Sequence, residues 1–187
     1  MTSMKRVERS DIVDRATYEQ ERPAFRRHVM DVKSRRRVHV GEHLTFLFEN
    51  AETLRYQVQE MLRVEQREAE QDIAHELATY NELLGGPGEL GCTLLIEIDD
   101  AALRDVLLRE WRALPAHLYA ELEDGTRVRA QVDRRQVGDE RLSSVQYLKF
   151  DCGGAVPVAL GSDLPALELR VALNPAQREA LALDLAS

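Results

Sequence analysis

Carboxylates and a histidine recur at helical spacing in the middle of the chain. The residues are Glu65, Glu68, Asp72, His75 and Glu76, with steps of three, four, three and one. On a helical wheel, Glu65, Asp72 and Glu76 fall within about 40° of one another, inside the apolar sector. Carboxylates in such a sector must be paired, hydrated or metal-bound, because an isolated buried charge is too costly. The pattern therefore makes these five residues a candidate site for a divalent metal ion.

The same carboxylates have a second interpretation, in which arginines of the first helix neutralise them. Apolar residues at helical spacing predict this helix from about residue 21 to the basic run at residues 35–37. A ferritin-like di-metal site needs a Glu-x-x-His pair on each of two helices, whereas this chain has only Asp72-x-x-His75, once. Residues 1–40 hold 11 basic and 6 acidic side chains, and residues 41–90 hold 3 basic and 11 acidic ones. We therefore expect the three carboxylates of the apolar sector to pair with arginines of the first helix, with a metal site as the alternative.

Arginines near the N-terminus form a second candidate site. The set comprises Arg22, Arg26 and Arg36, together with Gln57 and Arg63 of the following helix. Guanidinium groups bind carboxylate and phosphate oxygens through paired hydrogen bonds, so this set is a candidate site for a small anionic ligand. The alternative is that these arginines dock on the acidic helix of the same chain.

Both candidate sites depend on a helix that is predicted over residues 52–84. Apolar residues recur there with a period close to 3.6, and no glycine or proline interrupts them. We expect one unbroken helix of about 50 Å, which ends at the sequence GGPG of residues 85–88. The alternative is a helical hairpin with a break near residues 66–71. Asn50 is a candidate N-cap, with Thr53 as a second capping residue.

The rest of the chain has the patterns of β-strands and short helices. Strands are predicted at residues 38–40, 43–48, 92–98, 118–122, 145–150, 156–160 and 167–173. A turn at residues 123–125 predicts a hairpin with Ala120 opposite Val128. Further helices are expected after Asp100 and after Asn174.

The predicted class is α+β. N-terminal helices, including one long amphipathic helix packed on a mostly antiparallel sheet, precede a C-terminal helix. We expect a single domain over residues 1–187, helical over roughly residues 10–84 and rich in sheet over roughly residues 90–187.

Composition limits the classes of function. No run of 18 or more apolar residues is present, so no membrane span is expected, and the charged N-terminus does not resemble a secretory signal. Cys92 and Cys152 are far apart in apolar stretches, which predicts two buried thiols in a reducing compartment. The basic N-terminal segment faces an acidic segment of its own chain, which argues against nucleic-acid binding. We therefore expect a cytoplasmic protein.

Three stretches of the sequence resemble a known bacterial family. They are residues 21–65, with the string LFENAETLRYQVQEM, residues 73–98, with LGGPGELG, and LSSVQYLKFD at residues 142–151. Together they resemble the domain of unknown function 3501 family, whose members are often encoded beside rubrerythrin-like proteins and iron–sulfur oxidoreductases. The resemblance implies that any ligand site lies among its polar residues. These are Arg22, Arg26, Arg36, Glu49, Asn50, Gln57, Glu60, Arg63, Glu65, His75, Glu76, Tyr80 and Asn81.

The sequence is compatible with three functions, and it contains no motif that shows whether the chain is an enzyme. The first is an accessory protein of a redox or oxidative-stress system, with a rubrerythrin-like protein or an iron–sulfur oxidoreductase as partner. The second is a metal-binding protein or metal-dependent enzyme, and the third is a binder of a small anion. An iron–sulfur cluster is not expected, because the chain has no cysteine cluster. A homodimer is compatible with a long amphipathic helix, although no sustained heptad is present.

Overall fold

The computed structural model describes residues 6–133 and 138–187. Its helices are η1 (Arg9–Asp11), α1 (Arg15–Ser34), α2 (Ala51–Glu65), α3 (Glu70–Asn81), α4 (Ala101–Glu110), α5 (Leu114–His117) and α6 (Pro175–Leu185). Its strands are β1 (Arg37–Val40), β2 (Leu44–Phe48), β3 (Glu89–Ile96), β4 (Leu118–Glu121), β5 (Arg127–Arg129), β6 (Gln131–Val132), β7 (Val145–Asp151), β8 (Ala159–Leu164) and β9 (Leu167–Ala172). The class is α+β, as the sequence predicts.

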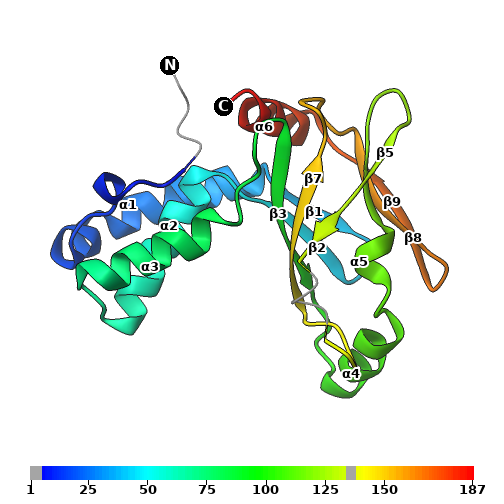
Figure 1. Cartoon of the computed structure of the whole chain (residues 1–187), viewed down its shortest axis with the longest axis horizontal. Helices are drawn as coiled ribbons and strands as arrows, with labels where there is room; N and C mark the ends of the chain where they lie inside the picture. The colour runs from blue at the N-terminus through cyan, green and yellow to red at the C-terminus, as the bar shows by residue number, and fades with distance from the viewer. Residues whose placement is uncertain (1–5, 134–137) are drawn as a thin grey trace.

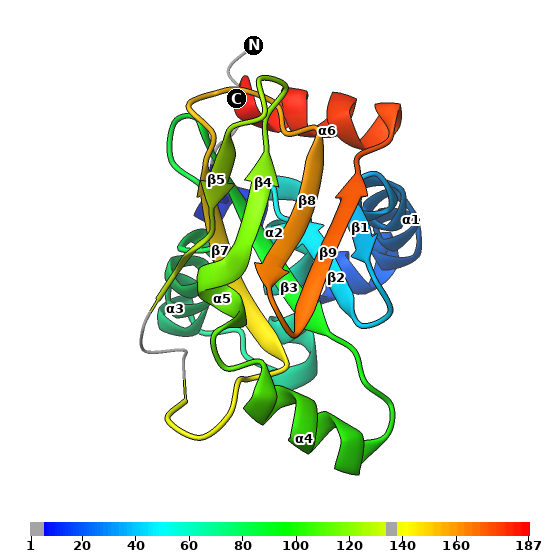
Figure 2. The same cartoon turned by 90° about the vertical axis from the view of Figure 1, so that its right-hand side faces the viewer.

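The strands form two antiparallel sheets that lie face to face. One sheet has the order β1-β2-β3-β7-β6 and the other the order β5-β4-β8-β9, and the second faces the viewer in Figure 2. Only Ala130 separates β5 from β6, so the chain passes there from one sheet to the other. Helices α1, α2 and α3 lie to one side of the sheets, α6 covers one end, and α4 projects at the opposite end (Figure 1).

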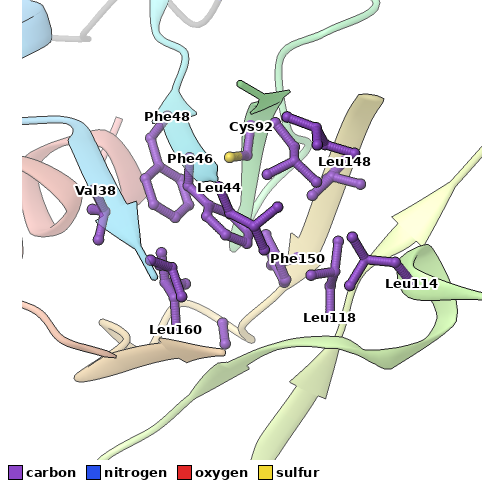
Figure 3. Packing of buried hydrophobic residues seen from close by; sticks show 14 of the residues in the cluster. Val38, Leu44, Phe46, Phe48, Cys92, Leu114, Leu118, Leu148, Phe150 and Leu160 are labelled. Atoms are coloured by element: carbon purple, nitrogen blue, oxygen red, sulfur yellow. The ribbon is translucent and has the colours of Figure 1, made fainter. Parts of the chain in front are cut away.

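The main hydrophobic core lies between the two sheets. Phe46, Phe48 and Phe150 of the first sheet and Leu118 and Leu160 of the second are almost fully buried in it (Figure 3). This core follows from the alternation along each strand, since every second side chain points to the same face. Helices α2 and α3 instead share a smaller core with the segment that precedes α1.

The predicted long helix is two helices, and the expectation of one unbroken helix was wrong. Helix α2 ends at Glu65, and Gln66 takes a left-handed conformation with φ of 54°. The Arg67 N–H then donates to the Leu62 carbonyl at 3.0 Å and the Gln66 N–H to the Arg63 carbonyl at 3.3 Å, which is the Schellman pattern of a helix end. The alternative prediction, a helical hairpin with a break near residues 66–71, is the observed arrangement.

Because residues 51–81 form a hairpin, the apolar residues of α2 and α3 pack against each other. Leu54, Val58 and Leu62 of α2 face Ile73 and Leu77 of α3. Two further apolar residues, Val7 and Ile12, come from the segment before α1 and complete this core. Helical periodicity alone does not distinguish one long helix from two antiparallel ones, because both place the same residues on one face.

Other local predictions are confirmed. The Asn50 side chain accepts from Thr53 N–H and the Thr53 hydroxyl accepts from Asn50 N–H, so both cap α2. Ala120 pairs with Val128 across the β4–β5 hairpin.

Strand β8 begins at Ala159, three residues later than predicted, because Pro157 has no N–H for a ladder. Among the described helices, none combines the length and apolar character needed to cross a bilayer.

Candidate functional site

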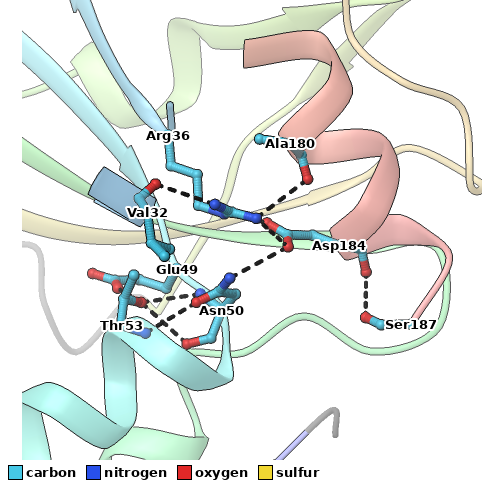
Figure 4. A network of polar contacts seen from close by, with 8 residues as sticks. All are labelled: Val32, Arg36, Glu49, Asn50, Thr53, Ala180, Asp184 and Ser187. Atoms are coloured by element: carbon cyan, nitrogen blue, oxygen red, sulfur yellow. Dashed lines mark hydrogen bonds and ion pairs between the residues drawn. The ribbon is translucent and has the colours of Figure 1, made fainter. Parts of the chain in front are cut away.

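Three segments that are distant in the sequence meet at one junction. Glu49 and Asn50 follow β2 and lead into α2, the loop after α3 leads into β3, and the last turn of α6 approaches both. Figure 4 shows the polar network that links Glu49 and Asn50 to Arg36 and to the last turns of α6. The junction contains the LFEN string that carries much of the family resemblance.

A buried ion pair holds α6 to this junction. Arg36, only 6% exposed, donates through Nε to Asp184 Oδ2 at 2.8 Å and through a terminal nitrogen to Oδ1 at 2.9 Å. The guanidinium also donates to the carbonyl oxygens of Val32 at 3.1 Å and Ala180 at 3.5 Å. The charges of Arg36 and Asp184 neutralise each other within the fold. Arg36 is therefore not available to bind a ligand.

Glu49 lies beside this ion pair in a mostly hydroxyl environment. Its carboxylate accepts from the Thr53 hydroxyl and, at 2.9 Å, from the Thr93 hydroxyl. The ammonium of Lys33 lies 5.2 Å from the centre of the Tyr56 ring. Burial lowers the pKa of Lys33, and the negative charge of Glu49 acts in the opposite direction. Lys33 therefore offers Glu49 a nearby charge without a direct ion pair.

The network borders a pocket of ≈250 Å³, called here the junction pocket. It is lined by Glu49, Asn50, Ala51, Glu52, Leu84, Gly85, Glu89, Leu90, Gly91, Asp184 and Ser187. Four of these residues carry carboxylates. Arg36 neutralises Asp184 and His28 contacts Glu52, whereas Glu89 has no ion pair within residues 6–133 and 138–187. The pocket is therefore suited to a cationic group.

Two glycines shape one wall of the junction pocket. A Cβ atom on Gly91 would lie 2.0 Å from the Leu83 carbonyl oxygen, and one on Gly85 would lie 2.4 Å from the Glu89 carbonyl oxygen. Side chains at these two positions would push the loop after α3 away from β3. The GGPGELG sequence is thus required for close packing at this wall, in addition to ending α3.

The predicted metal set is divided by the hairpin. Glu65 lies in the last turn of α2 and Glu68 in the loop, while Asp72, His75 and Glu76 lie on α3. The residues that the structure describes contain no group of three or more histidine, cysteine or acidic side chains placed to share a metal ion. The five residues therefore do not form the continuous helical edge on which their selection was based.

The expected pairing of these carboxylates with the first helix was wrong. Glu65 pairs with Arg67 in the adjoining loop at 2.9 Å, and within the described ranges Asp72 and Glu76 make no ion pair. Arginines before and within α1 contact other acids. Arg22 pairs with Glu60 at 2.6 Å and Arg9 with Glu70 at 2.6 Å. The basic N-terminal segment does form ion pairs with the acidic segment that follows it. These ion pairs involve Glu60 and Glu70, and not Glu65, Asp72 or Glu76.

The predicted anion-binding residues also lie apart. Arg22 donates two hydrogen bonds to Glu60, which the Tyr18 hydroxyl also contacts at 2.7 Å. Arg26 is exposed on α1, and Arg36 is in the junction network. Arg63 pairs with Glu19 at 2.7 Å. Gln57, the last member of the set, contacts Tyr80. Asn81, a candidate ligand-binding residue from the family resemblance together with Glu60 and Tyr80, binds the backbone of Val7.

Several junction residues were not selected from the sequence as site residues. As site residues, Glu49 and Asn50 follow only from the family resemblance, although Asn50 is also a predicted N-cap, and the sequence does not mark Glu52, Glu89 or Asp184 as site residues. Asp184 is 148 residues from Arg36, and no local pattern connects residues at such a separation. The LFEN and GGPGELG strings were the available signal, because both line the junction pocket.

Comparisons with known proteins identify a family and do not assign an activity. A family model described as "Protein of unknown function (DUF3501)" matches residues 6–185. A solved structure of a protein of unknown function from Burkholderia pseudomallei K96243 is 29% identical, with a TM-score of 0.87. That match covers 96% of this chain and 98% of the other. Among curated proteins, no match is found.

Proposed function

The chain belongs to the DUF3501 family, and we propose that it is a non-catalytic accessory protein of a bacterial redox system. In this proposal a partner protein inserts a basic side chain into the junction pocket. The partner belongs to the class that the family resemblance suggests, a rubrerythrin-like protein or an iron–sulfur oxidoreductase.

The charge of the junction pocket is the observation that supports this proposal. Glu49, Glu52, Glu89 and Asp184 line it, and within residues 6–133 and 138–187 only Asp184 of the four pairs with an arginine. Carboxylates with incomplete compensation favour a cation, and the attraction is strengthened where the surroundings exclude water. Asp184 has a side chain only 12% exposed, whereas that of Glu52 is 51% exposed. The negative charge thus extends from the surface inward.

The shape and lining of the pocket favour a lysine or arginine side chain over a simple ion. Such side chains combine a cationic head with an apolar stem. Leu84, Leu90 and Ala51 supply apolar wall beside the carboxylates. A long basic side chain would therefore find matching contacts along its whole length.

The thiols of the chain support the non-catalytic part of the proposal. Cys92 and Cys152 are free and buried. Burial raises the pKa of the Cys152 thiol to about 11 and also raises the pKa of Cys92 well above its usual range. The thiolate is the reactive form of cysteine, so these two thiols are poorly suited to exchange electrons themselves.

The test is a binding measurement with both candidate partners. The purified chain is titrated with the rubrerythrin-like protein and with the iron–sulfur oxidoreductase of the same organism. We expect one of them to bind, and the Glu52→Gln/Glu89→Gln variant to bind about tenfold more weakly. The matched control is Glu123→Gln/Glu168→Gln, which removes two exposed glutamates that have no ion pair in the described structure.

Each outcome of this test bears on a separate part of the proposal. If neither protein binds, the proposed partner class is wrong. If one binds equally well to both double variants, the contact lies outside the junction pocket. Turnover of a peroxide or another redox substrate by the purified chain alone would contradict the non-catalytic role.

A further inference from the structure

A second pocket lies between the start of α1, the end of α2 and the start of α3. Its volume is ≈400 Å³, within the range of small-molecule sites. We call it the hairpin pocket. Val13, Leu62 and Ile73 give it an apolar floor, and Arg15, Arg63 and Arg67 contribute guanidinium groups to its lining.

The three arginines retain hydrogen-bond donors. Arg63 contacts Glu19 through Nε at 2.7 Å, and Arg67 contacts Glu65 through Nε at 2.9 Å. Arg15 makes no hydrogen bond or ion pair with any residue that the structure describes. Neither Glu19 nor Glu65 lines the pocket. Terminal guanidinium nitrogens at this site are therefore available to an anion.

Two of the carboxylates at the hairpin pocket are already engaged. Asp14 accepts from the backbone N–H and the hydroxyl of Thr17, and these hydrogen bonds lower its pKa. Glu70 accepts two hydrogen bonds from Arg9, at 2.6 and 2.8 Å. Glu68 is the third, and it lies exposed in the hairpin loop. Because the carboxylates of Asp14 and Glu70 already accept hydrogen bonds, they compete weakly with a ligand for the guanidinium groups of the three arginines.

The end of α2 fixes the backbone that carries one of these groups. The left-handed Gln66 and the hydrogen bond from Arg67 N–H to the Leu62 carbonyl at 3.0 Å define where Arg67 leaves the helix. A ligand at this site would meet a defined backbone and would order only side chains, which reduces the entropic cost of binding.

We propose that the hairpin pocket binds a small organic carboxylate with an apolar body. The carboxylate would accept hydrogen bonds from Arg15, Arg63 and Arg67, because a guanidinium group matches the geometry of a carboxylate. The apolar body would cover Leu62 and Ile73. This site is independent of the junction pocket, so that the two proposals succeed or fail separately.

The experiment is isothermal titration of the full chain with 2-naphthoate and with octanoate. The neutral 2-naphthylmethanol serves as the uncharged analogue. We expect at least one carboxylate to bind and the alcohol to bind at least tenfold more weakly. Binding of neither carboxylate overturns the proposal, and equal binding of the alcohol overturns the role of the arginines.

Two arginine variants locate the binding on the surface. Arg15→Gln removes a pocket guanidinium that makes no hydrogen bond or ion pair with any described residue, so we expect the fold to be retained. We expect a loss of about threefold to tenfold in affinity. Arg26→Gln is the matched control, since Arg26 is equally exposed on α1 and lies outside the pocket. Equal losses from both variants, or none from Arg15→Gln, would show that binding occurs elsewhere.

Discussion

The side-chain amide of Gln59 pairs with the backbone of Val13 as a second peptide group would. Gln59 Oε1 accepts from the Val13 N–H at 2.8 Å, and Nε2 donates to the Val13 carbonyl at 3.3 Å. Asn81 does the same to Val7, with both distances at 2.9 Å. One amide from α2 and one from α3 therefore hold the segment before α1 against the helical hairpin.

Gln59→Met should lower the free energy of unfolding by about 1–3 kcal/mol. Gln59 is only 3% exposed, and an apolar replacement leaves two backbone groups of Val13 without their partner. Urea denaturation measures the change. Gln20→Met is the control, because Gln20 is exposed on α1 and should shift stability by less than about 0.5 kcal/mol. Equal stability of the two variants would contradict the structural role of the Gln59 amide.

Asp184→Asn should destabilise the fold by about 3 kcal/mol. The change leaves the charge of Arg36 buried without a counter-ion, which costs far more than loss of a surface pair. Asp31→Asn removes the exposed pair of Asp31 with Arg35 and should cost less than about 0.5 kcal/mol. Chemical denaturation of both variants gives the comparison. Similar values would mean that α6 is not held by the Arg36–Asp184 ion pair.

Asp163 should make stability depend on pH in the acid range. Hydrogen bonds from the Arg129 guanidinium and then from His117 lower the pKa of Asp163 from its ordinary value of 3.8 to about 2. Since the folded-state pKa is the lower one, ionised Asp163 stabilises the fold above the unfolded-state pKa. That stabilisation is lost as the pH falls toward 2.

Asp163→Asn should accordingly flatten the pH dependence. Unfolding free energies of the wild type should fall more steeply than those of the variant as the pH decreases through this window. Asp99→Asn changes an exposed aspartate without an ion pair among the described residues and should retain the wild-type slope. An unchanged slope in Asp163→Asn would remove this carboxylate as the cause.

Both thiols should resist alkylation while the protein is folded. Cys92 is 2% and Cys152 4% exposed, and burial raises the pKa of each thiol. Brief treatment with iodoacetamide at neutral pH, followed by intact-mass measurement, should give the unmodified mass. The same treatment in guanidinium chloride should add two labels. Rapid labelling of the native protein would show that a thiol is accessible.

Gln66→Gly should stabilise the helical hairpin by about 1 kcal/mol. Gln66 has φ of 54°, a conformation that glycine adopts without the steric cost of a Cβ atom. Ala74→Gly, at an exposed position within α3, should have the opposite effect by a similar amount. Thermal or urea unfolding measures both. Destabilisation by Gln66→Gly would argue against a left-handed residue between α2 and α3.

Features that depend on neighbouring residues could be predicted from the amino-acid sequence. Caps at Asn50 and Asn174, the Ala120–Val128 register and most strand positions follow from hydrogen bonds and periodicities within a few residues. The burial of both cysteines was also predicted, because each lies in an apolar stretch. These features together were sufficient for the α+β class.

The tertiary structure alone decided the break in the long helix and the composition of the junction pocket. The same apolar period suits one helix or two, and the choice depends on Val7 and Ile12, which add to the core of the hairpin. Arg36 could have met any of several acidic residues, and its pairing with Asp184 depends on where the sheets place α6. Local interactions extend over a few residues, whereas contacts between distant segments are set by how the whole chain packs.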